Sequence, residues 1–221
     1  MNTAKIAMLF DLDKTIAKEL FEESLYPWEV LPSIKEFIIK LGNTLPEEKY
    51  EKRGENIWIA KSAKVFPSVY IGEPCIIDEN AEIRHCAFIR GSVIVGKNAV
   101  VGNSTELKNA VLFDNVHVPH FNYVGDSILG YKAHMGAGAI TSNVKGDKSL
   151  IKIRDGEEVI ETCIKSVGAM LGDNVEIGCN TVLCPGTVVG KNSRVYPGCV
   201  IRGVVKENKI YKNENNIIDI V

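Results

Sequence analysis

The chain lacks several features that would narrow its function at once. No apolar run among its 221 residues approaches the roughly 18 residues of a transmembrane helix. Asp11 and Asp13 end the first apolar stretch too early for a secretory signal. Positive charge is not in excess, because 28 Asp and Glu outnumber 26 Lys and Arg. We therefore expect neither nucleic acid nor a membrane as the partner, and a cytoplasmic location.

Paired cysteine motifs are also missing. The sequence has six Cys but no C-x-x-C pair, so neither a zinc knot nor a disulfide framework is indicated. Without a signal peptide, we expect reduced thiols, most of them packed in the interior. The six are Cys75, Cys86, Cys163, Cys179, Cys184 and Cys199.

What the sequence has instead is a six-residue repeat. Aliphatic residues recur at every sixth position, with two one-residue frame slips in the middle of the chain. The first series is Ile59, Val65, Ile71, Ile77, Ile83, Ile89, Val95, Val101 and Leu107. After the slips come Leu112, Val118 and Val124, then Leu129 and Met135, and finally Leu171, Ile177, Leu183, Val189, Val195 and Ile201. The residue four places further on is small or compact, as at Ala63 and Ala81.

A period of six matches neither a helix nor simple strand alternation. It fits coils of triangular cross-section, in which each hexapeptide forms one flat side and the aliphatic residue points inward. We therefore predict an all-β fold, a left-handed parallel β-helix over residues 57–206, with coils about 4.8 Å apart. The hand is taken from the resemblance to hexapeptide-repeat proteins, because parallel crossovers are otherwise right-handed.

Three segments fall outside the repeat. Residues 1–56 carry helical apolar spacing at 15–23 and 33–41, which predicts a small helical cap over the first coil. Residues 142–165 contain two alternating runs around Asp155-Gly156, which predict an inserted β-hairpin. Residues 207–221 are rich in Asn and Lys and should form a surface tail.

Two motifs lie where the frame slips. The segment His120-Phe-Asn-Tyr-Val-Gly-Asp126 precedes Met135-Gly-Ala-Gly-Ala-Ile-Thr-Ser-Asn143, and Arg90-Gly91, Gly102-Asn103 and Glu106-x-Lys108 lie upstream. This pattern resembles the acetyltransferase domain of the bacterial bifunctional N-acetylglucosamine-1-phosphate uridyltransferase/glucosamine-1-phosphate acetyltransferase, over about residues 59–205. The resemblance implies a step in UDP-N-acetylglucosamine biosynthesis. It also implies a homotrimer that binds acetyl-CoA in a groove between neighbouring prisms.

The resemblance assigns acceptor-side roles to four residues. His120 matches the catalytic base, and an imidazole with a pKa near 6.5 suits that role at neutral pH. It would take the proton of an aminosugar amine that attacks the thioester directly, without a covalent enzyme intermediate. Arg90 and Lys108 match positions that hold the sugar phosphate, which charge-assisted hydrogen bonds do well. Tyr123 matches a sugar contact.

The resemblance also assigns residues to the cofactor, and at some positions this sequence departs from the family pattern. Ala137 and Asn143 match positions at the acetyl-CoA end. Cys179 replaces a family serine and Pro197 a family alanine, so both are expected beside the cofactor. His134 replaces a family asparagine, and we expect it to border the acceptor pocket. The acceptor is therefore predicted as an aminosugar phosphate or a nucleotide aminosugar. The nucleotidyltransferase half of the family is missing.

A phosphatase is one alternative. Asp11-Leu-Asp13-Lys-Thr15 resembles the nucleophile motif of haloacid-dehalogenase-type phosphatases, in which one carboxylate attacks phosphorus beside magnesium. That fold needs well over a hundred residues of doubly wound sheet, and the repeat begins too soon. A helix-capping role for Asp13 is the simpler interpretation.

A zinc hydrolyase of the γ-carbonic-anhydrase kind shares the predicted fold. His85 and His120 should stack in one slot two coils apart, but a third ligand is absent from its expected place, which is Gly125. No metal is therefore predicted.

A non-catalytic protein is a third alternative. A homologue that binds or senses sugar nucleotides could keep the fold and lose turnover. Substitution of His120 separates this alternative from the enzyme.

Overall fold

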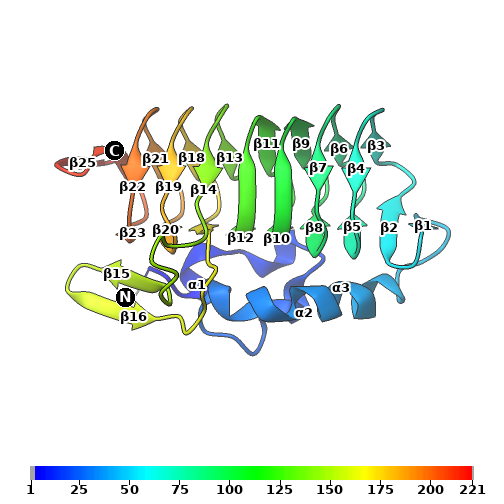
Figure 1. Ribbon diagram of the computed structural model, residues 1–221, viewed down its shortest axis with the longest axis horizontal. Coiled ribbons are helices and arrows are strands. Elements are labelled where there is room, and N and C mark those ends of the chain that lie inside the picture. Colours follow the sequence, from blue (N-terminus) through cyan, green and yellow to red (C-terminus); the bar gives the residue numbers. More distant parts are fainter. Residues whose placement is uncertain (1–2, 221) are drawn as a thin grey trace.

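The computed structural model describes residues 3–220, which form a long prism of stacked coils with helices along one flank (Figure 1). Strands at equivalent places of successive coils pair in parallel, and a 14-stranded and a nine-stranded sheet make the walls. The fold is the left-handed parallel β-helix that the repeat and the family resemblance predict.

The prism has three sides. The nine-stranded side contains β3 (Lys64–Val65), β6 (Glu82–Ile83), β9 (Val100–Asn103), β11 (His117–His120), β13 (His134–Met135), β18 (Glu176–Ile177), β21 (Arg194–Val195), β24 (Lys209–Asn213) and β25 (Asn216–Asp219). The open side contains β4 (Tyr70–Ile71), β7 (Phe88–Ile89), β14 (Ile140–Thr141), β19 (Val182–Leu183), β22 (Val200–Ile201) and the first halves of β10 (Glu106–Leu112) and β12 (Tyr123–Leu129). The helix-covered side contains the second halves of β10 and β12, with β2 (Ile57–Ala60), β5 (Cys75–Ile77), β8 (Val93–Val95), β17 (Ala169–Leu171), β20 (Thr187–Val189) and β23 (Val204–Val205).

The repeated aliphatic residues form the core, as predicted. Ile77, Ile83 and Ile89 are fully buried, and so are Leu112 and Met135 of the shifted series. Each such side chain contributes about 1.5–3 kcal/mol through burial. The frame slips keep these residues inside because the coil shortens there. Register partners are 18 residues apart between β5 and β8 but 17 apart between β8 and β10.

The N-terminal helices lie along one side of the prism and do not cap its N-terminal end. They are α1 (Ile6–Leu9), η1 (Leu12–Lys14), α2 (Lys18–Phe21), η2 (Pro27–Ser33) and α3 (Ile34–Gly42). Phe10 and Phe21 pack against Phe113 of a middle coil, with ring centroids 5.1 and 5.6 Å away. The predicted position over the first coil is therefore wrong. The reason is that Ile76 and Ile94 point outward on this side of the prism. The N-terminal segment covers them, so both are fully buried.

The remaining segments extend the solenoid at its two ends. β1 (Tyr50–Arg53) pairs antiparallel with β2 at the N-terminal end. β15 (Lys152–Asp155) and β16 (Glu158–Glu161) form the inserted antiparallel hairpin, which projects beside the C-terminal coils (Figure 1). The C-terminal residues are not a simple surface tail, because β24 pairs with β21 and Tyr211 is buried.

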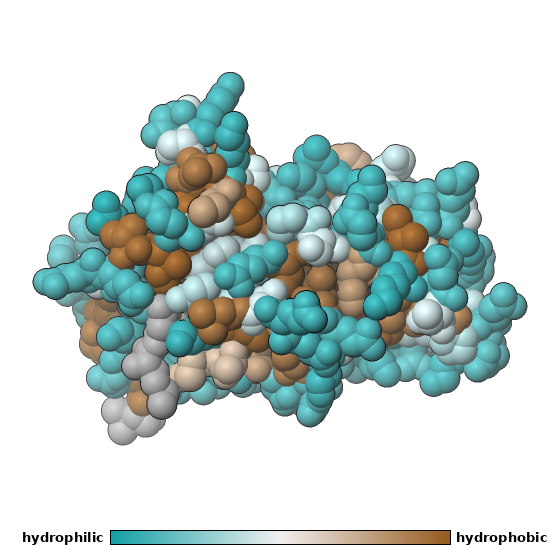
Figure 2. Space-filling model, turned by 90° about the horizontal axis from the view of Figure 1, so that it is seen from below, coloured by the Kyte–Doolittle hydropathy of each residue, from teal (hydrophilic) through white to brown (hydrophobic). Residues whose placement is uncertain are grey.

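The outer surface is mixed. Seen from the helix-covered side, hydrophilic residues alternate with small hydrophobic patches (Figure 2). No helix within residues 3–220 combines the length and the apolar character needed to cross a membrane. All six cysteines are free, and Cys75, Cys184 and Cys199 are buried.

Candidate functional site

One corner of the prism collects the residues predicted for base and cofactor. We call it the His120 corner, where the nine-stranded side meets the open side, and its members in successive coils are His85, Asn103, His120, Ala137, Cys179 and Pro197. The amides of Gly138, Asn180 and Gly198 donate to the carbonyls of His120, Ala137 and Cys179 over 2.8 to 3.0 Å. The structure therefore aligns the predicted base with three predicted cofactor residues in one column.

The local sequence explains why the chain turns at this corner. The residue after each corner member adopts a left-handed conformation, including Phe121 with a φ of 51° and Gly138 with a φ of 71°. Glycine and asparagine adopt this region readily, but a bulky residue does so at a cost. Phe121 nonetheless holds it with 61% of its surface exposed, directly after His120. Because the same conformation recurs at Cys86, Ser104 and Asn180, the turn of the coil requires it, and it leaves Phe121 at the surface beside His120.

Asn122 fixes the backbone on either side of His120. Its buried amide donates to the carbonyls of Gly136 and Ala139 over 2.8 and 3.0 Å, and its oxygen accepts from the His120 amide over 3.1 Å. The imidazole of His120 is exposed and makes no hydrogen bond within residues 3–220. A rigid backbone thus presents a free imidazole at the corner.

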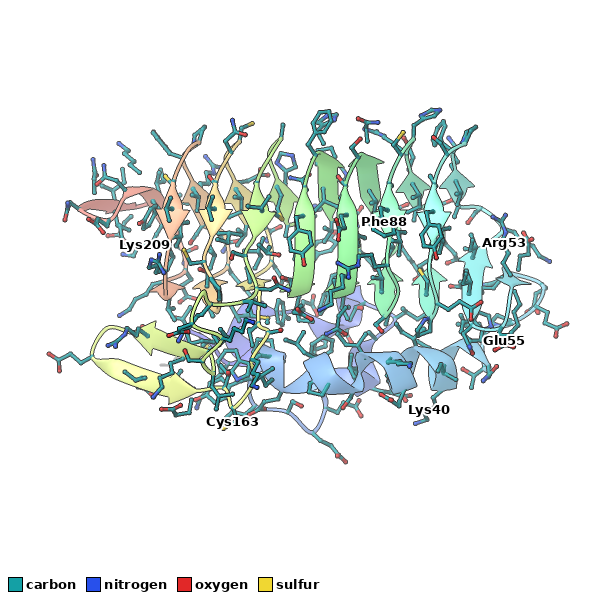
Figure 3. The ribbon with its side chains drawn as sticks, in the orientation of Figure 1. Lys40, Arg53, Glu55, Phe88, Cys163 and Lys209 are labelled. Carbon is teal, nitrogen blue, oxygen red and sulfur yellow. The ribbon has the colours of Figure 1, made fainter. Side chains whose placement is uncertain are left out.

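The other edge of the open side carries the predicted phosphate ligands. Arg90 follows β7, and its guanidinium lies 3.0 Å from a carboxylate oxygen of Glu106. Lys108, in β10, lies 3.0 and 3.2 Å from the two oxygens of Asp126 in β12. Both cations therefore face the same side, one coil apart, and each already has an anionic partner. Phe88 projects from β7 on this face (Figure 3).

Asn143 belongs to the same network. Its amide nitrogen donates to Asp126 over 2.6 Å, so the residue predicted at the acetyl-CoA end lies beside Lys108. Asp126 and Asn109 were not assigned a role from the sequence, although Asn109 also donates to Asp126 over 2.9 Å. The sequence spacing could have predicted this network. Asp126 follows Lys108 by 18 residues and precedes Asn143 by 17, and each interval is one coil.

Tyr123 lies between the His120 corner and the Lys108 edge. Its ring covers Gly125, where an added Cβ would come within 2.4 Å of the phenol oxygen. Burial raises the pKa of the Tyr123 hydroxyl, and Asp126 and Glu106 raise it further, while Lys108 and Arg90 oppose them. The hydroxyl therefore stays protonated at neutral pH and can donate to a sugar oxygen.

His134 is not brought to these residues. It lies on the nine-stranded side, where its Nδ1 is 2.8 Å from a carboxylate oxygen of Glu176. It lines a shallow depression of about 460 Å³ with Asn115, His117, Lys132 and Glu176. Its neighbour His117 has a pKa lowered first by burial and then by the charges of His134 and Arg84. Within one prism, the expectation that His134 borders the acceptor pocket is not met, because its strand faces away from Tyr123.

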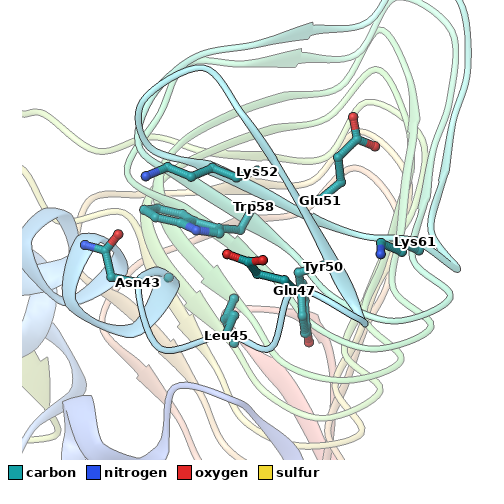
Figure 4. Close-up of a pocket in the computed structure, with 9 residues that line it drawn as sticks. Asn43, Leu45, Glu47, Tyr50, Glu51, Lys52, Trp58 and Lys61 are labelled. Carbon is teal, nitrogen blue, oxygen red and sulfur yellow. The ribbon is translucent and has the colours of Figure 1, made fainter.

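A separate cavity opens at the N-terminal end of the prism. It has a volume of about 410 Å³ and lies between the end of α3 and the β1–β2 pair (Figure 4). Trp58 forms one wall, with the Lys52 ammonium 5.3 Å from its ring centroid. None of its lining residues belongs to the predicted site. The predicted residues instead line an open corner and a flat side.

The alternatives receive no support from the geometry. Asp13 pairs with Lys18 at the surface, and Asp11 accepts a hydrogen bond from the Asp13 amide as the N-cap of η1. Both acidic residues of the phosphatase-like motif therefore have structural roles. His85 and His120 do share one corner, but within residues 3–220 no three His, Cys, Asp or Glu side chains converge as metal ligands would.

Family models match two parts of the chain. Residues 71–165 match the GMPPB C-terminal domain, and residues 168–203 match the bacterial transferase hexapeptide of six repeats. Together they span the His120 corner, the inserted hairpin and the later coils.

Solved structures resemble the chain only loosely. The acetyltransferase domain of PglB from Neisseria gonorrhoeae has 16% identity and a TM-score of 0.28 over 73% of this chain and 56% of that one. The polysialic acid O-acetyltransferase OatWY has 14% identity and a TM-score of 0.31 over 71% of this chain and 83% of that one. Similarity this weak carries no conclusion about the function of the chain.

Curated relatives give the strongest similarity. Bifunctional GlmU proteins of Methanococcus maripaludis and Methanocaldococcus jannaschii are each 32% identical, over 87% and 86% of this chain and 47% of each relative. The bifunctional sugar-1-phosphate nucleotidylyltransferase/acetyltransferase of Sulfurisphaera tokodaii is 29% identical over 84% of this chain and 47% of that relative. The chain spans about half the length of these relatives. The chain is thus similar to about half of each of these bifunctional proteins, and its later coils match the bacterial transferase hexapeptide.

Proposed function

We propose that the protein is a CoA-dependent N-acetyltransferase that acts on an aminosugar phosphate or a nucleotide aminosugar. The amine attacks the thioester carbonyl of acetyl-CoA, the new C–N bond forms and the C–S bond breaks. His120 takes the proton that the amine loses, and the departing thiolate accepts a proton. The observation that carries the proposal is the free imidazole of His120 at one edge of the open side, in the same column as Ala137, whose turn donates the Gly138 amide to the His120 carbonyl.

The open side has the parts that such an acceptor needs. Tyr123 offers a protonated hydroxyl beside the corner, and Lys108 and Arg90 offer cationic groups at the far edge. A sugar bridging these groups would place its amine toward His120 and its phosphate toward Lys108. The name of the relative from Sulfurisphaera tokodaii, a sugar-1-phosphate nucleotidylyltransferase/acetyltransferase, supports this chemistry.

Acetyl-CoA would run along the His120 corner past Ala137, Cys179 and Pro197. The corner is convex, so a groove for the cofactor requires a second surface, and a neighbouring prism can supply it. A homotrimer that forms this groove is part of the proposal, and closed cyclic assembly suits the flat sides. Light scattering coupled to gel filtration tests the oligomeric state.

The decisive test is CoA-thiol release from acetyl-CoA across a panel of aminosugar phosphates and UDP-aminosugars. We expect His120→Ala to lower kcat at least about 100-fold, because a general base contributes about 10²–10⁴-fold. His85→Ala is the matched control, since His85 is also exposed in the His120 corner, two coils earlier. Thermal unfolding checks that both variants fold.

Two results would overturn the proposal. One is unchanged turnover in His120→Ala. The other is thiol release no faster than background with every acceptor of the panel. In the second case, binding of the same sugars without turnover would favour the non-catalytic alternative.

A further inference from the structure

Asp126 is a buried carboxylate that joins three coils of the open side. Its side chain is 4% exposed and accepts from the Lys108 ammonium, the Asn109 amide and the Asn143 amide. Lys108 lies one coil before it and Asn143 one coil after it. Removing a charge from water is costly unless hydrogen bonds and an opposite charge compensate, and here both do. Asp126 is therefore held firmly in one position.

The charge of Asp126 decides which way Asn143 points. An ionised carboxylate can only accept hydrogen bonds, so the amide nitrogen of Asn143 must face it. The amide oxygen of Asn143 is then turned away, and within residues 3–220 no group donates to it. It is available to accept a hydrogen bond from an N–H or O–H group of a ligand on the open side.

The same carboxylate orients Lys108. Two contacts of 3.0 and 3.2 Å join its ammonium to Asp126, while 34% of the Lys108 side chain stays exposed. An ammonium has three donors, so at least one remains for a phosphate oxygen. Holding a long lysine side chain in advance lowers the entropy that binding would otherwise cost.

We infer that Asp126 is a positioning residue, which fixes the acceptor oxygen of Asn143 and the ammonium of Lys108 so that both can bind polar groups of one substrate. The inference rests on the proposed acyl transfer. It gives a role to the last residue of the His120–Asp126 motif, which does not itself reach the reacting atoms.

Asp126→Asn tests the inference. The new amide presents N–H where one carboxylate oxygen accepted from the Lys108 ammonium and from the Asn109 or Asn143 amide, so at least one of these three donors loses its acceptor. The ion pair that holds Lys108 is lost in either case. We expect kcat to fall and the KM for glucosamine-1-phosphate to rise, each at least about tenfold, because small misplacements of catalytic groups cost up to about 100-fold.

The matched control is Asp173→Asn. Asp173 is equally buried and lies 3.0 Å from the Lys191 ammonium, but it binds the N-terminal segment on another part of the prism. It should lower the thermal unfolding temperature to a similar extent and leave kcat and KM unchanged. A purely structural role for Asp126 would give the two variants the same kinetics, and that result overturns the inference.

A double-mutant cycle with Asn143→Ala adds a second readout. If Asp126 acts through Asn143, its substitution should lower kcat little further once Asn143 is removed. Independent effects that multiply in the double variant contradict the inference.

Calorimetric binding of glucosamine-1-phosphate separates the inference from the acyltransferase proposal. A wild type that binds this sugar but releases no CoA thiol with any acceptor of the panel overturns the acyltransferase proposal, and weaker binding by Asp126→Asn then still supports the link to Lys108. Equal binding by wild type and variant, or no binding by either, overturns the inference.

Discussion

The carboxylate of Asp173 accepts a 2.8 Å hydrogen bond from the backbone amide of Asp11, 162 positions earlier in the chain. The Asp173 amide in turn donates to the Leu9 carbonyl over 3.0 Å, and its side chain also binds the Tyr131 amide and the Lys191 ammonium. A single buried acidic residue thus fastens the N-terminal segment to the coil that follows the hairpin.

Asp173→Ala should loosen this attachment. We expect a loss of about 2–4 kcal/mol in the free energy of unfolding, because removing one partner of a buried pair leaves the other uncompensated. Urea denaturation measures the loss, and limited proteolysis should show earlier cleavage within residues 1–45. Asp13→Ala is the control in the same segment, since its pair with Lys18 is exposed and its loss should leave the free energy of unfolding almost unchanged. Equal losses in the two variants would show that Asp173 does not fasten the segment.

The six-residue repeat predicted the core because it records which residues point inward. It did not predict the helix-covered side, although the signal was present. In Cys75-Ile76-Ile77, the middle residue points outward but is fully buried. The same holds for Ile94 between Val93 and Val95. A run of three apolar residues in a strand means cover on both faces. Among the strands of residues 3–220, such runs lie only on this side of the prism, and the N-terminal helices supply the cover.

The position of each residue within its coil also explains which predicted site residues lie together in the structure and which do not. Family spacing brought His120, Ala137, Cys179 and Pro197 into one corner, because a fixed coil length makes equal spacing equal position. His134 could not be placed by resemblance, since the side that a residue faces depends on its slot within the hexapeptide. The network around Asp126 required side-chain geometry, because the sequence does not show that Lys108 meets a carboxylate of the next coil.

Close packing of successive coils makes Gly102 indispensable. A Cβ at this position would lie 1.5 Å from the Pro119 carbonyl oxygen of the next coil. Gly102→Ala must therefore push two coils apart, and we expect a loss of more than about 3 kcal/mol or a failure to fold. Gly146→Ala is the matched control, since a Cβ there meets nothing within 4 Å, and its effect should stay within about 1 kcal/mol. Urea denaturation compares the two. A mild effect of Gly102→Ala would contradict this coil spacing.

Asp114 should make stability depend on pH. Burial raises the pKa of its carboxyl, and Asp78 raises it further, against the Lys97 amide and the charges of Lys97 and Lys14. The folded state therefore binds this proton more tightly than the unfolded state. The resulting stability is present below the unfolded pKa of about 3.9 and is lost as pH rises through the higher folded pKa.

Asp114→Asn removes that loss, because its amide stays neutral and can still accept from the Lys97 amide. Relative to wild type, the variant should gain stability as pH rises from about 4 to about 7. Urea denaturation of both proteins at several pH values measures the difference. A constant difference, or one that moves in the opposite direction, would contradict the raised pKa.

Cysteine labelling tests the proposed path of acetyl-CoA without relying on turnover. Cys86, Cys163 and Cys179 are exposed, whereas Cys75 is fully buried and its pKa is raised by burial, which makes it inert. Cys179 lies one coil beyond Ala137 in the His120 corner, so bound acetyl-CoA should cover it. Cys163 follows the inserted hairpin, away from this corner (Figure 3).

We expect acetyl-CoA to slow iodoacetamide labelling of Cys179 about tenfold at a free concentration ten times its Kd, because only the unliganded fraction reacts. Labelling of Cys163 should not change, and Cys86 is a further control, since it lies near His85 at the opposite end of the corner from Pro197. Mass spectrometry follows the three sites in one sample. Protection of all three would indicate a general tightening of the fold, and protection of none would place the cofactor elsewhere. Selective protection of Cys179 requires a ligand that lies along the His120 corner on its C-terminal side.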